Sequence, residues 1–209
     1  MLAVEGPGLY PVRMTWIDLT RPMDGHLPIY AEAGYADPPF AVHDWCAVEG
    51  QGYAVQRLDL GTQTGTHIDA PAHMVAGGAT LEALSPSRLI GRYVTFRPGE
   101  VLPDRGEAVL LFLNAPDGGE VSRALFDAAL ALGFPVWVMA GSLRVRGEEP
   151  LFLHRALARA GVFLVEDLDA EAARPLPDRG EMIAAPLRLI GTSGAPCRVL
   201  ARAMAGEGR

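Results

Sequence analysis

The feature that most constrains the fold is a series of short apolar segments interrupted by two segments with helical periodicity. The two segments, at 119–133 and 148–161, repeat apolar residues at helical spacing, and each ends at a glycine, as helices commonly do. The other apolar segments have the length and composition of strands. They lie at 14–20, 88–96, 107–114, 135–141, 162–168, 181–191 and 196–204. This pattern predicts a mixed α/β domain with more strand than helix.

The N-terminal part of the chain is less regular. Residues 21–40 are too rich in proline and glycine for regular structure. Residues 41–60 alternate around Gly50 and Gly52, which predicts a hairpin whose second strand leads into a histidine-containing segment. A chain of 209 residues, 49% of them hydrophobic, suits one domain over 1–209. The ends are predicted to be an extension at 1–13 and a frayed tail at 204–209.

Composition excludes several classes of partner. The formal net charge is −7 and all 18 basic residues are arginine without a cluster, so we expect neither nucleic acid nor an anionic membrane as partner. No window approaches the roughly 18 apolar residues that span a bilayer, and the start does not resemble a signal peptide. Cys46 and Cys197 are too few for a disulfide framework, and we expect both to be buried small residues. The predicted location is cytoplasmic.

The segment GTQTGTHIDAPAHM concentrates residues that can bind a metal ion. If it contains the end of a strand, His67 and Asp69 point to one face, and their Cα atoms lie roughly 6.5 to 7 Å apart. Gln63, at the same two-residue spacing, joins that face. Pro71 ends the strand, so His73 can approach the same site from another side. A histidine beside a turn is most often structural, so this segment alone does not decide between the two interpretations.

His154 and Glu166 form a second pair of candidate ligands. A helix over 148–160 extends about 9 Å beyond His154, and a strand over 162–166 runs back about 13 Å antiparallel to it. The His154 and Glu166 side chains should therefore lie near the same end of this helix–strand unit. A carboxylate at the end of the apolar strand VFLVE is costly unless it is paired, protonated or metal-bound, although a strand-end acid can also simply reach water. Two independent pairs favour a metal site.

These residues carry a resemblance to a known family. QTGTHIDAPAH resembles the signature H-x-G-T-H-x-D-x-P-x-H of the cyclase family, metal-dependent hydrolases that include bacterial kynurenine formamidase and isatin hydrolase. MTWIDLTRPMDGHLPIY resembles the family's opening strand and substrate loop, HRALARAGVFLVEDL its His-to-Glu helix and strand, and APLRLIGTSGAPCRVLA its last strand pair. The resemblance covers residues 16–201 and implies a swivelling β/β/α-like fold and a homodimer or larger homo-oligomer.

The resemblance also implies a role for each candidate residue. In formamidases of this family, two motif histidines and the Asp bind one zinc, and the Asp bridges to a second zinc held by the downstream His and Glu. By position, the implied metal ligands are His67, Asp69, His154 and Glu166. His73 matches the general acid/base, and Tyr30 falls closest to the aromatic residue that packs on the substrate ring. The implied cofactor is one or two divalent ions, Zn²⁺ or Mn²⁺.

Gln63 stands where the signature has its first histidine. An amide oxygen is a weaker zinc ligand than imidazole and suits harder cations better. Gln63 is kept among the candidate ligands, and three possibilities stay open: the site holds one metal rather than two, it prefers Mn²⁺, or catalysis is lost. A second departure is VMAGSLRVRGEEP, where formamidases usually show a Gly-x-Asp and a Ser-x-Asp before the helix, and it leaves the substrate open.

The predicted function is metal-assisted hydrolysis of a small amide, lactam or ester. A bound divalent cation polarises the carbonyl and lowers the pKa of its water toward about 7, while His73 transfers the proton. Two alternatives remain: lyase or cyclisation chemistry at the same site without addition of water, and a catalytically silent protein that binds a small molecule, which the presence of Gln63 favours.

Overall fold

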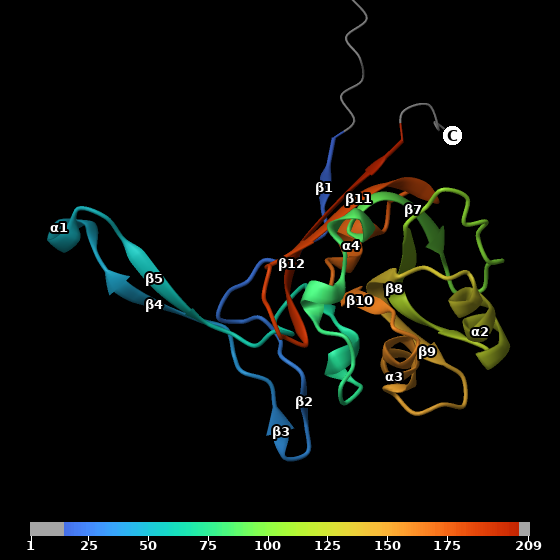
Figure 1. Cartoon of the computed structure of the whole chain (residues 1–209). Helices are drawn as coiled ribbons and strands as arrows, with labels where there is room; N and C mark the ends of the chain where they lie inside the picture. The colour runs from blue at the N-terminus through green and yellow to red at the C-terminus, as the bar shows by residue number, and fades with distance from the viewer. Residues whose placement is uncertain (1–14, 205–209) are drawn as a thin grey trace, which may run out of the picture.

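The computed structural model describes residues 15–204, and its central feature is a closed strand barrel (Figure 1). The predicted extension at 1–13, and the predicted tail beyond residue 204, lie outside the described residues. Around the barrel, neighbouring strands are β6 (His67–Asp69), β12 (Gly194–Ala203), β11 (Arg179–Pro186), β7 (Ile90–Phe96), β8 (Leu110–Val121), β9 (Val136–Val145) and β10 (Phe163–Glu166). The barrel closes because β10 pairs with β6 again, and β1 (Ile17–Asp18) pairs with β12 outside it.

The strands β7 to β10 run parallel, and the two long helices connect three of them. α2 (Arg123–Ala131) joins β8 to β9, and α3 (Phe152–Arg159) joins β9 to β10. Both helices start later than the sequence predicts. Residues 119–121 extend β8 until the Ser122 side chain accepts a hydrogen bond from Leu125 N and starts α2. Gly133 and Gly161, with φ of 72° and 74°, follow the helices as predicted.

The barrel has an inner core and an outer core because side chains alternate along each strand. In β9, Val136 and Val138 belong to the inner cluster, which fills the barrel. Trp137 belongs to the outer cluster under the helices, where its ring lies 5.9 Å from that of Phe126 in α2. The prediction of a mixed α/β domain with more strand than helix is confirmed.

β6 lies between β10 and β12 and is antiparallel to both. Its middle residue, Ile68, belongs to the inner core. Because side chains alternate, His67 and Asp69 point to the outer face of the barrel, on the side of Leu164, which belongs to the outer core. In the register of β6 and β10, Glu166 lies directly opposite His67. The closure of the barrel thus brings together two parts of the chain that are far apart in sequence.

Two hairpins precede β6. The predicted hairpin at 41–60 is confirmed: β4 (Ala41–Cys46) pairs with β5 (Val55–Asp59), α1 (Val48–Gln51) lies between them, and the whole extends away from the barrel (Figure 1). The prediction that 21–40 has no regular structure was wrong. β2 (Ala31–Glu32) and β3 (Tyr35–Ala36) form a small hairpin, because Gly34, with φ of 84°, permits the tight turn between them.

The remaining elements are short and were not predicted. α4 (Ala170–Ala173) is capped by the Asp169 carboxylate, and 3₁₀ turns cover Pro71–His73, Leu81–Ala83 and Pro86–Arg88. Among the residues described, no helix is long and apolar enough to cross a membrane. The two cysteines differ: Cys197 is buried as predicted, but Cys46 is partly exposed because it lies on the projecting hairpin.

Candidate metal centre

Thr66 fixes the start of β6. Its hydroxyl accepts a hydrogen bond from Arg21 N and donates one to the carbonyl O of Asp167, the residue after β10. Its carbonyl accepts a hydrogen bond from Cys197 N in β12. The threonine therefore ties the entry of β6 to both neighbouring strands, and this sets where His67 emerges. Thr66 thus has a structural role in placing the neighbouring His67.

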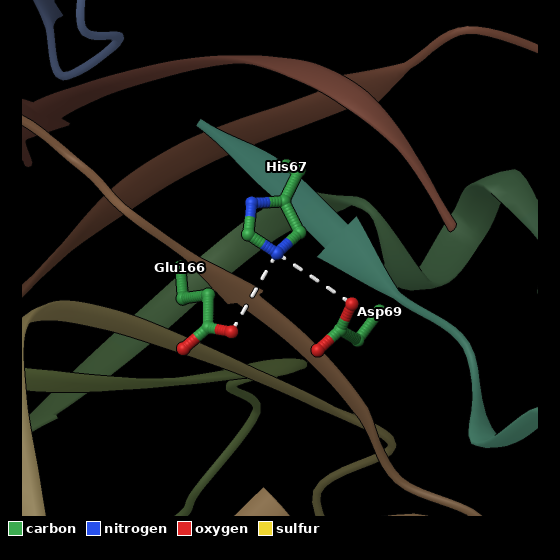
Figure 2. Close-up of side chains that lie close together, drawn as sticks. All are labelled: His67, Asp69 and Glu166. Carbon is green, nitrogen blue, oxygen red and sulfur yellow. Dashed lines mark ion pairs between the residues drawn. The ribbon is translucent and has the colours of Figure 1, made fainter. Parts of the chain in front are cut away.

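His67 is held with one nitrogen aimed at two carboxylates (Figure 2). Its Nδ1 lies 2.7 Å from the carbonyl O of Gly65, which can only accept, so Nδ1 carries a hydrogen. Its Nε2 lies 3.5 Å from Asp69 Oδ1 and 3.5 Å from Glu166 Oε1. In the neutral ring the Nε2 lone pair would face two anionic oxygens. A proton or a cation must therefore lie between these three groups.

Burial and charge shift the pKa values of all three groups. Burial opposes protonation of His67, but the interaction with Glu166 and the charge of Asp69 outweigh it and raise the pKa of His67 to about 9. Burial, and then the charge of Glu166, raise the pKa of Asp69 to about 6. Burial alone would raise the pKa of Glu166, but hydrogen bonds from His154 and His67 hold it well below its usual value. Without a bound cation, the charges of the buried Asp69 and Glu166 carboxylates repel each other.

His154, from α3, reaches the same cluster. Its Nε2 lies 2.9 Å from Glu166 Oε2, so the two oxygens of Glu166 face two different imidazoles. Its Nδ1 is buried without a hydrogen-bond partner in the described part of the chain, which leaves Nε2 as the nitrogen directed at the site. The prediction that the helix and strand return His154 and Glu166 to one end of the unit is confirmed.

The residues fit a divalent cation. Ligand atoms of His67, Asp69 and Glu166 all lie within 4.8 Å of one another. Ligand bonds of about 2.0–2.2 Å at tetrahedral angles would separate neighbouring donors by roughly 3.4 Å, close to the two 3.5 Å distances at Nε2. The nitrogen and oxygen donors suit Zn²⁺ or Mn²⁺, and the Gly65 carbonyl on Nδ1 is the kind of outer contact that orients a metal-binding histidine.

Gln63 lies beside the cluster, but not for the reason that the sequence suggested. β6 begins only at His67, and Gly65 has a left-handed φ of 64°, so Gln63 lies in a turn and not on the strand face. Its Nε2 nevertheless lies 3.3 Å from Asp69 Oδ1, and its Oε1 accepts a hydrogen bond of 2.5 Å from the Thr62 hydroxyl. In this orientation the amide donates to Asp69. Its predicted role as a metal ligand stays a prediction.

A pocket of about 330 Å³ opens beside the cluster, and the two other predicted site residues, His73 and Tyr30, line it. His73 lines it from the 3₁₀ turn that follows β6 and is exposed to solvent, as expected for a side chain redirected by Pro71. Tyr30 also lines it and is 48% exposed, with its hydroxyl 3.0 Å from Glu32 Oε2. The structure therefore brings Gln63 and every predicted site residue to one pocket or its floor.

Comparisons with known proteins agree with this geometry. The family model described as a putative cyclase matches residues 17–110, the part that contains the motif histidines. The kynurenine formamidase of Geobacillus thermodenitrificans is 26% identical over 210 residues, which cover 90% of this chain and 98% of that protein. Residues 17–110 of the chain thus resemble the cyclase family, and the similarity to kynurenine formamidases extends over 90% of the chain. The predicted resemblance is confirmed.

Solved structures extend the match to the whole barrel. A structure described as a potential metal-dependent hydrolase with cyclase activity covers 92% of the chain, and 99% of its own length is matched, with a TM-score of 0.66 and 25% identity. Isatin hydrolase A from Labrenzia aggregata has a TM-score of 0.73 at 19% identity and covers 94% of this chain and 96% of its own. The second likeness shows a shared fold.

Sequence reasoning missed three polar residues that line the pocket, Tyr35, Asp37 and Asp167. Tyr35 and Asp37 come from the β3 side of the small hairpin, where the Tyr35 hydroxyl donates to Asp37 Oδ1 at 2.7 Å. Asp167 follows Glu166 with a φ of 57°, the one positive φ outside glycine in residues 15–204. The two-residue spacing of Tyr35 and Asp37 was visible in the sequence, but their position depends on a hairpin that was not predicted.

Proposed function

We propose that this chain is a metal-dependent hydrolase that cleaves a C–N bond other than a peptide bond, in a small amide or lactam, or the related bond of an ester. The observation that carries the proposal is the convergence of His67 Nε2 with Asp69 and Glu166, three donor atoms within 4.8 Å on the floor of a pocket. The match to the cyclase family model and the similarity to proteins named kynurenine formamidase support the same reaction class.

The chain's own residues divide the work between holding and proton transfer. His67, Asp69 and Glu166 would hold the cation, with His154 on the second oxygen of Glu166. Gln63 Nε2 donates to Asp69 and keeps that carboxylate in place. When bound, a divalent cation supplies polarisation of the substrate carbonyl and a lowered pKa for the attacking water.

His73 would move the proton. It lines the pocket and is exposed, so it can take a proton from the attacking water and return it to the leaving nitrogen. A carbon–oxygen bond forms, the carbon–nitrogen bond breaks, and the water proton ends on the amine. The apolar walls that include Pro28, Met74 and Leu151, with the ring of Tyr30 at the opening, favour a small substrate with an aryl or alkyl body.

Gln63 supports a second candidate function, a protein that binds a small molecule without turning it over. Its amide nitrogen donates a hydrogen bond to Asp69, and its amide oxygen already accepts one from Thr62. Gln63 therefore adds no free metal-binding atom to the cluster. The variant Gln63→His separates the two functions. A large gain in metal affinity and turnover would indicate an impaired natural site, whereas no gain would indicate that Gln63 is adapted to the reaction.

The test begins with metal analysis of the purified protein. Aryl formamides and cyclic amides are then screened for turnover before EDTA, after EDTA, and after Zn²⁺ or Mn²⁺ is restored. The variant His67→Ala is expected to lose both metal and turnover. The matched control is His26→Ala, because His26 is exposed in a turn and does not line the pocket. Product mass distinguishes hydrolysis, which adds one water, from lyase or cyclisation chemistry.

The proposal fails if no divalent ion co-purifies or restores turnover of any substrate in the screen. It also fails if His67→Ala and His26→Ala lose activity equally, because the cluster would then have no special role.

A further inference from the structure

Asp167 has an unusual backbone conformation directly after the candidate ligand Glu166. Its φ of 57° lies in the left-handed region, which few residues other than glycine, asparagine and aspartate adopt. The Asp167 carbonyl accepts a hydrogen bond from the Thr66 hydroxyl at 2.7 Å. The next carbonyl, that of Leu168, accepts one from Arg21 Nε at 3.0 Å. These contacts from two other segments of the chain hold the backbone in this conformation.

The left-handed step decides where the Asp167 side chain points. Val165 and Leu168 belong to the inner core, and Glu166 faces the outer side of the barrel beside His67. With regular alternation, residue 167 would face the inner core and residue 168 would not. The irregular step instead gives the inner position to Leu168 and leaves Asp167 lining the pocket, with its side chain 53% exposed. The chain thus avoids the cost of a carboxylate in the barrel interior.

The Asp167 carboxylate is weakly paired within the protein. Among residues 15–204, no group donates a hydrogen bond to it. Its ion pair with Arg21 Nη2 spans 4.0 Å, and Arg21 Nε already donates to the Leu168 carbonyl. An exposed contact at that distance contributes little. Both carboxylate oxygens can therefore accept hydrogen bonds from a molecule in the pocket.

The charge of the pocket wall points to the kind of group that Asp167 would bind. Of the twelve residues that line the pocket, three are acidic and none is arginine, and the chain has no lysine. Glu166 belongs to the metal cluster, and Asp37 Oδ1 already accepts a hydrogen bond from the Tyr35 hydroxyl at 2.7 Å. Asp167 is therefore the acidic residue of the lining that is most available to a ligand. A wall of this charge attracts an ammonium or N–H group and repels a carboxylate.

We propose that Asp167 is a specificity-determining residue, whose carboxylate accepts a hydrogen bond from an ammonium or N–H group on the body of the substrate. The pocket prefers an amide whose aryl or alkyl body carries an amine over the matched neutral or anionic compound. Because this assignment names the substrate class of the same pocket, it rests on the proposed function. Asp167 binds and selects the substrate and takes no part in proton transfer.

Three aryl formamides of matched shape test the preference. Of these, meta-(aminomethyl)formanilide carries an ammonium, meta-methylformanilide is neutral, and meta-formamidobenzoate carries a carboxylate. For the native protein supplied with Zn²⁺ or Mn²⁺, kcat/KM is expected to fall in that order. A hydrogen bond between charged groups supports a roughly 10-fold preference for the cationic over the neutral compound. The preference should shrink as the salt concentration rises, because the carboxylate is partly exposed.

Two variants separate the charge of Asp167 from its backbone conformation. Asp167→Asn keeps a residue that tolerates the left-handed region but removes the charge, and Asp167→Gly keeps the conformation but removes the side chain. Both are expected to lower kcat/KM for the cationic compound roughly 10-fold relative to the neutral one. The matched control is Asp127→Asn, which should keep the native ratio. Asp127 is 52% exposed, forms an ion pair with Arg123 and does not line the pocket.

A binding measurement distinguishes failure of this assignment from failure of the proposed function. The amines left after deformylation, meta-(aminomethyl)aniline and meta-toluidine, are titrated calorimetrically into the native protein and the variants without any turnover. The native protein and Asp127→Asn are expected to bind the diamine roughly 10-fold more tightly, whereas Asp167→Asn should bind the two amines about equally. If no substrate in the metal-dependent screen is cleaved, the proposed function fails, but this titration still decides on Asp167.

Two results overturn the assignment. One is a native protein without preference between the two amines, including one that binds neither measurably. The other is an Asp167→Asn variant that loses affinity or cleavage equally for the cationic and the neutral compound, since that would indicate a structural role alone.

Discussion

Replacing Asp69 by asparagine should stabilise the metal-free protein but weaken its stabilisation by a bound metal ion. In the metal-free protein, burial and the charge of Glu166 raise the pKa of Asp69 from 3.8 to about 6. Because the folded-state pKa lies above the unfolded value, ionised Asp69 disfavours folding at every pH above about 6, and the cost disappears below about 4. A shift of about two units corresponds to about 3 kcal/mol at neutral pH.

The net gain in the variant Asp69→Asn is smaller, because His67 loses an anionic neighbour. Gln63 Nε2 and His67 Nε2 both lie nearest the same oxygen, Asp69 Oδ1, at 3.3 Å and 3.5 Å, so the asparagine can keep its oxygen for Gln63 or turn its N–H toward His67, but not both. We expect the variant to be more stable than the native protein by about 1–3 kcal/mol without metal. For a chain of this size that raises Tm by about 2–12 °C.

A bound cation should reverse this order. An ion at 100 times its Kd stabilises the native protein by about 2.7 kcal/mol, a rise in Tm of about 5–11 °C, and Asp69→Asn should gain much less because it lacks the anionic ligand. Calorimetry at neutral pH in EDTA, and then with Zn²⁺ or Mn²⁺, measures both effects. The control Glu107→Gln changes a carboxylate whose side chain is 80% exposed and should match the native protein throughout. A variant less stable than native in EDTA would refute the reasoning, as would a native Tm that neither ion raises.

Three further outcomes are expected. His73→Ala should lower kcat roughly 10²- to 10⁴-fold while metal content and Tm stay unchanged, since His73 is exposed and outside the cluster; a parallel loss of metal would contradict its assignment to proton transfer. Burial raises the pKa of the Cys197 thiol to about 12, so iodoacetamide at mildly alkaline pH should modify it only after unfolding, as mass spectrometry can show. Gly194→Ala should lower both Tm and metal affinity, because its Cβ would lie 2.5 Å from Ile68 O and 2.6 Å from Gln63 Nε2; titration calorimetry with native affinity would be the contrary result.

The candidate metal centre was predictable because its candidate ligands lie in two short segments whose local geometry is simple. His67 and Asp69 share a strand face by the two-residue period, and His154 and Glu166 are brought together by a helix and strand that reverse at Gly161. What the sequence could not provide is the pairing of β6 with β10. That pairing joins residues about a hundred positions apart, and no local pattern specifies it.

The wrong predictions arise where a turn at a single glycine overrides a local sequence pattern. Gln63 matched the strand period, but Gly65 takes a left-handed φ and turns the chain before β6. The 21–40 segment is rich in glycine and proline, and yet Gly34 closes a hairpin there that supplies Tyr35 and Asp37 to the pocket. The alternation at 41–60 predicted the hairpin itself, but no local pattern indicated that both of its strands would be exposed and extend away from the barrel.

The most direct test of the metal centre is an anomalous difference map from crystals grown with Zn²⁺ or Mn²⁺ and measured at the absorption edge of the ion. We predict a strong peak within ligand distance of His67 Nε2, Asp69 and Glu166, and its loss in crystals of Asp69→Asn. A map without a peak at this cluster, or with peaks confined to carboxylates on the surface, would contradict the account.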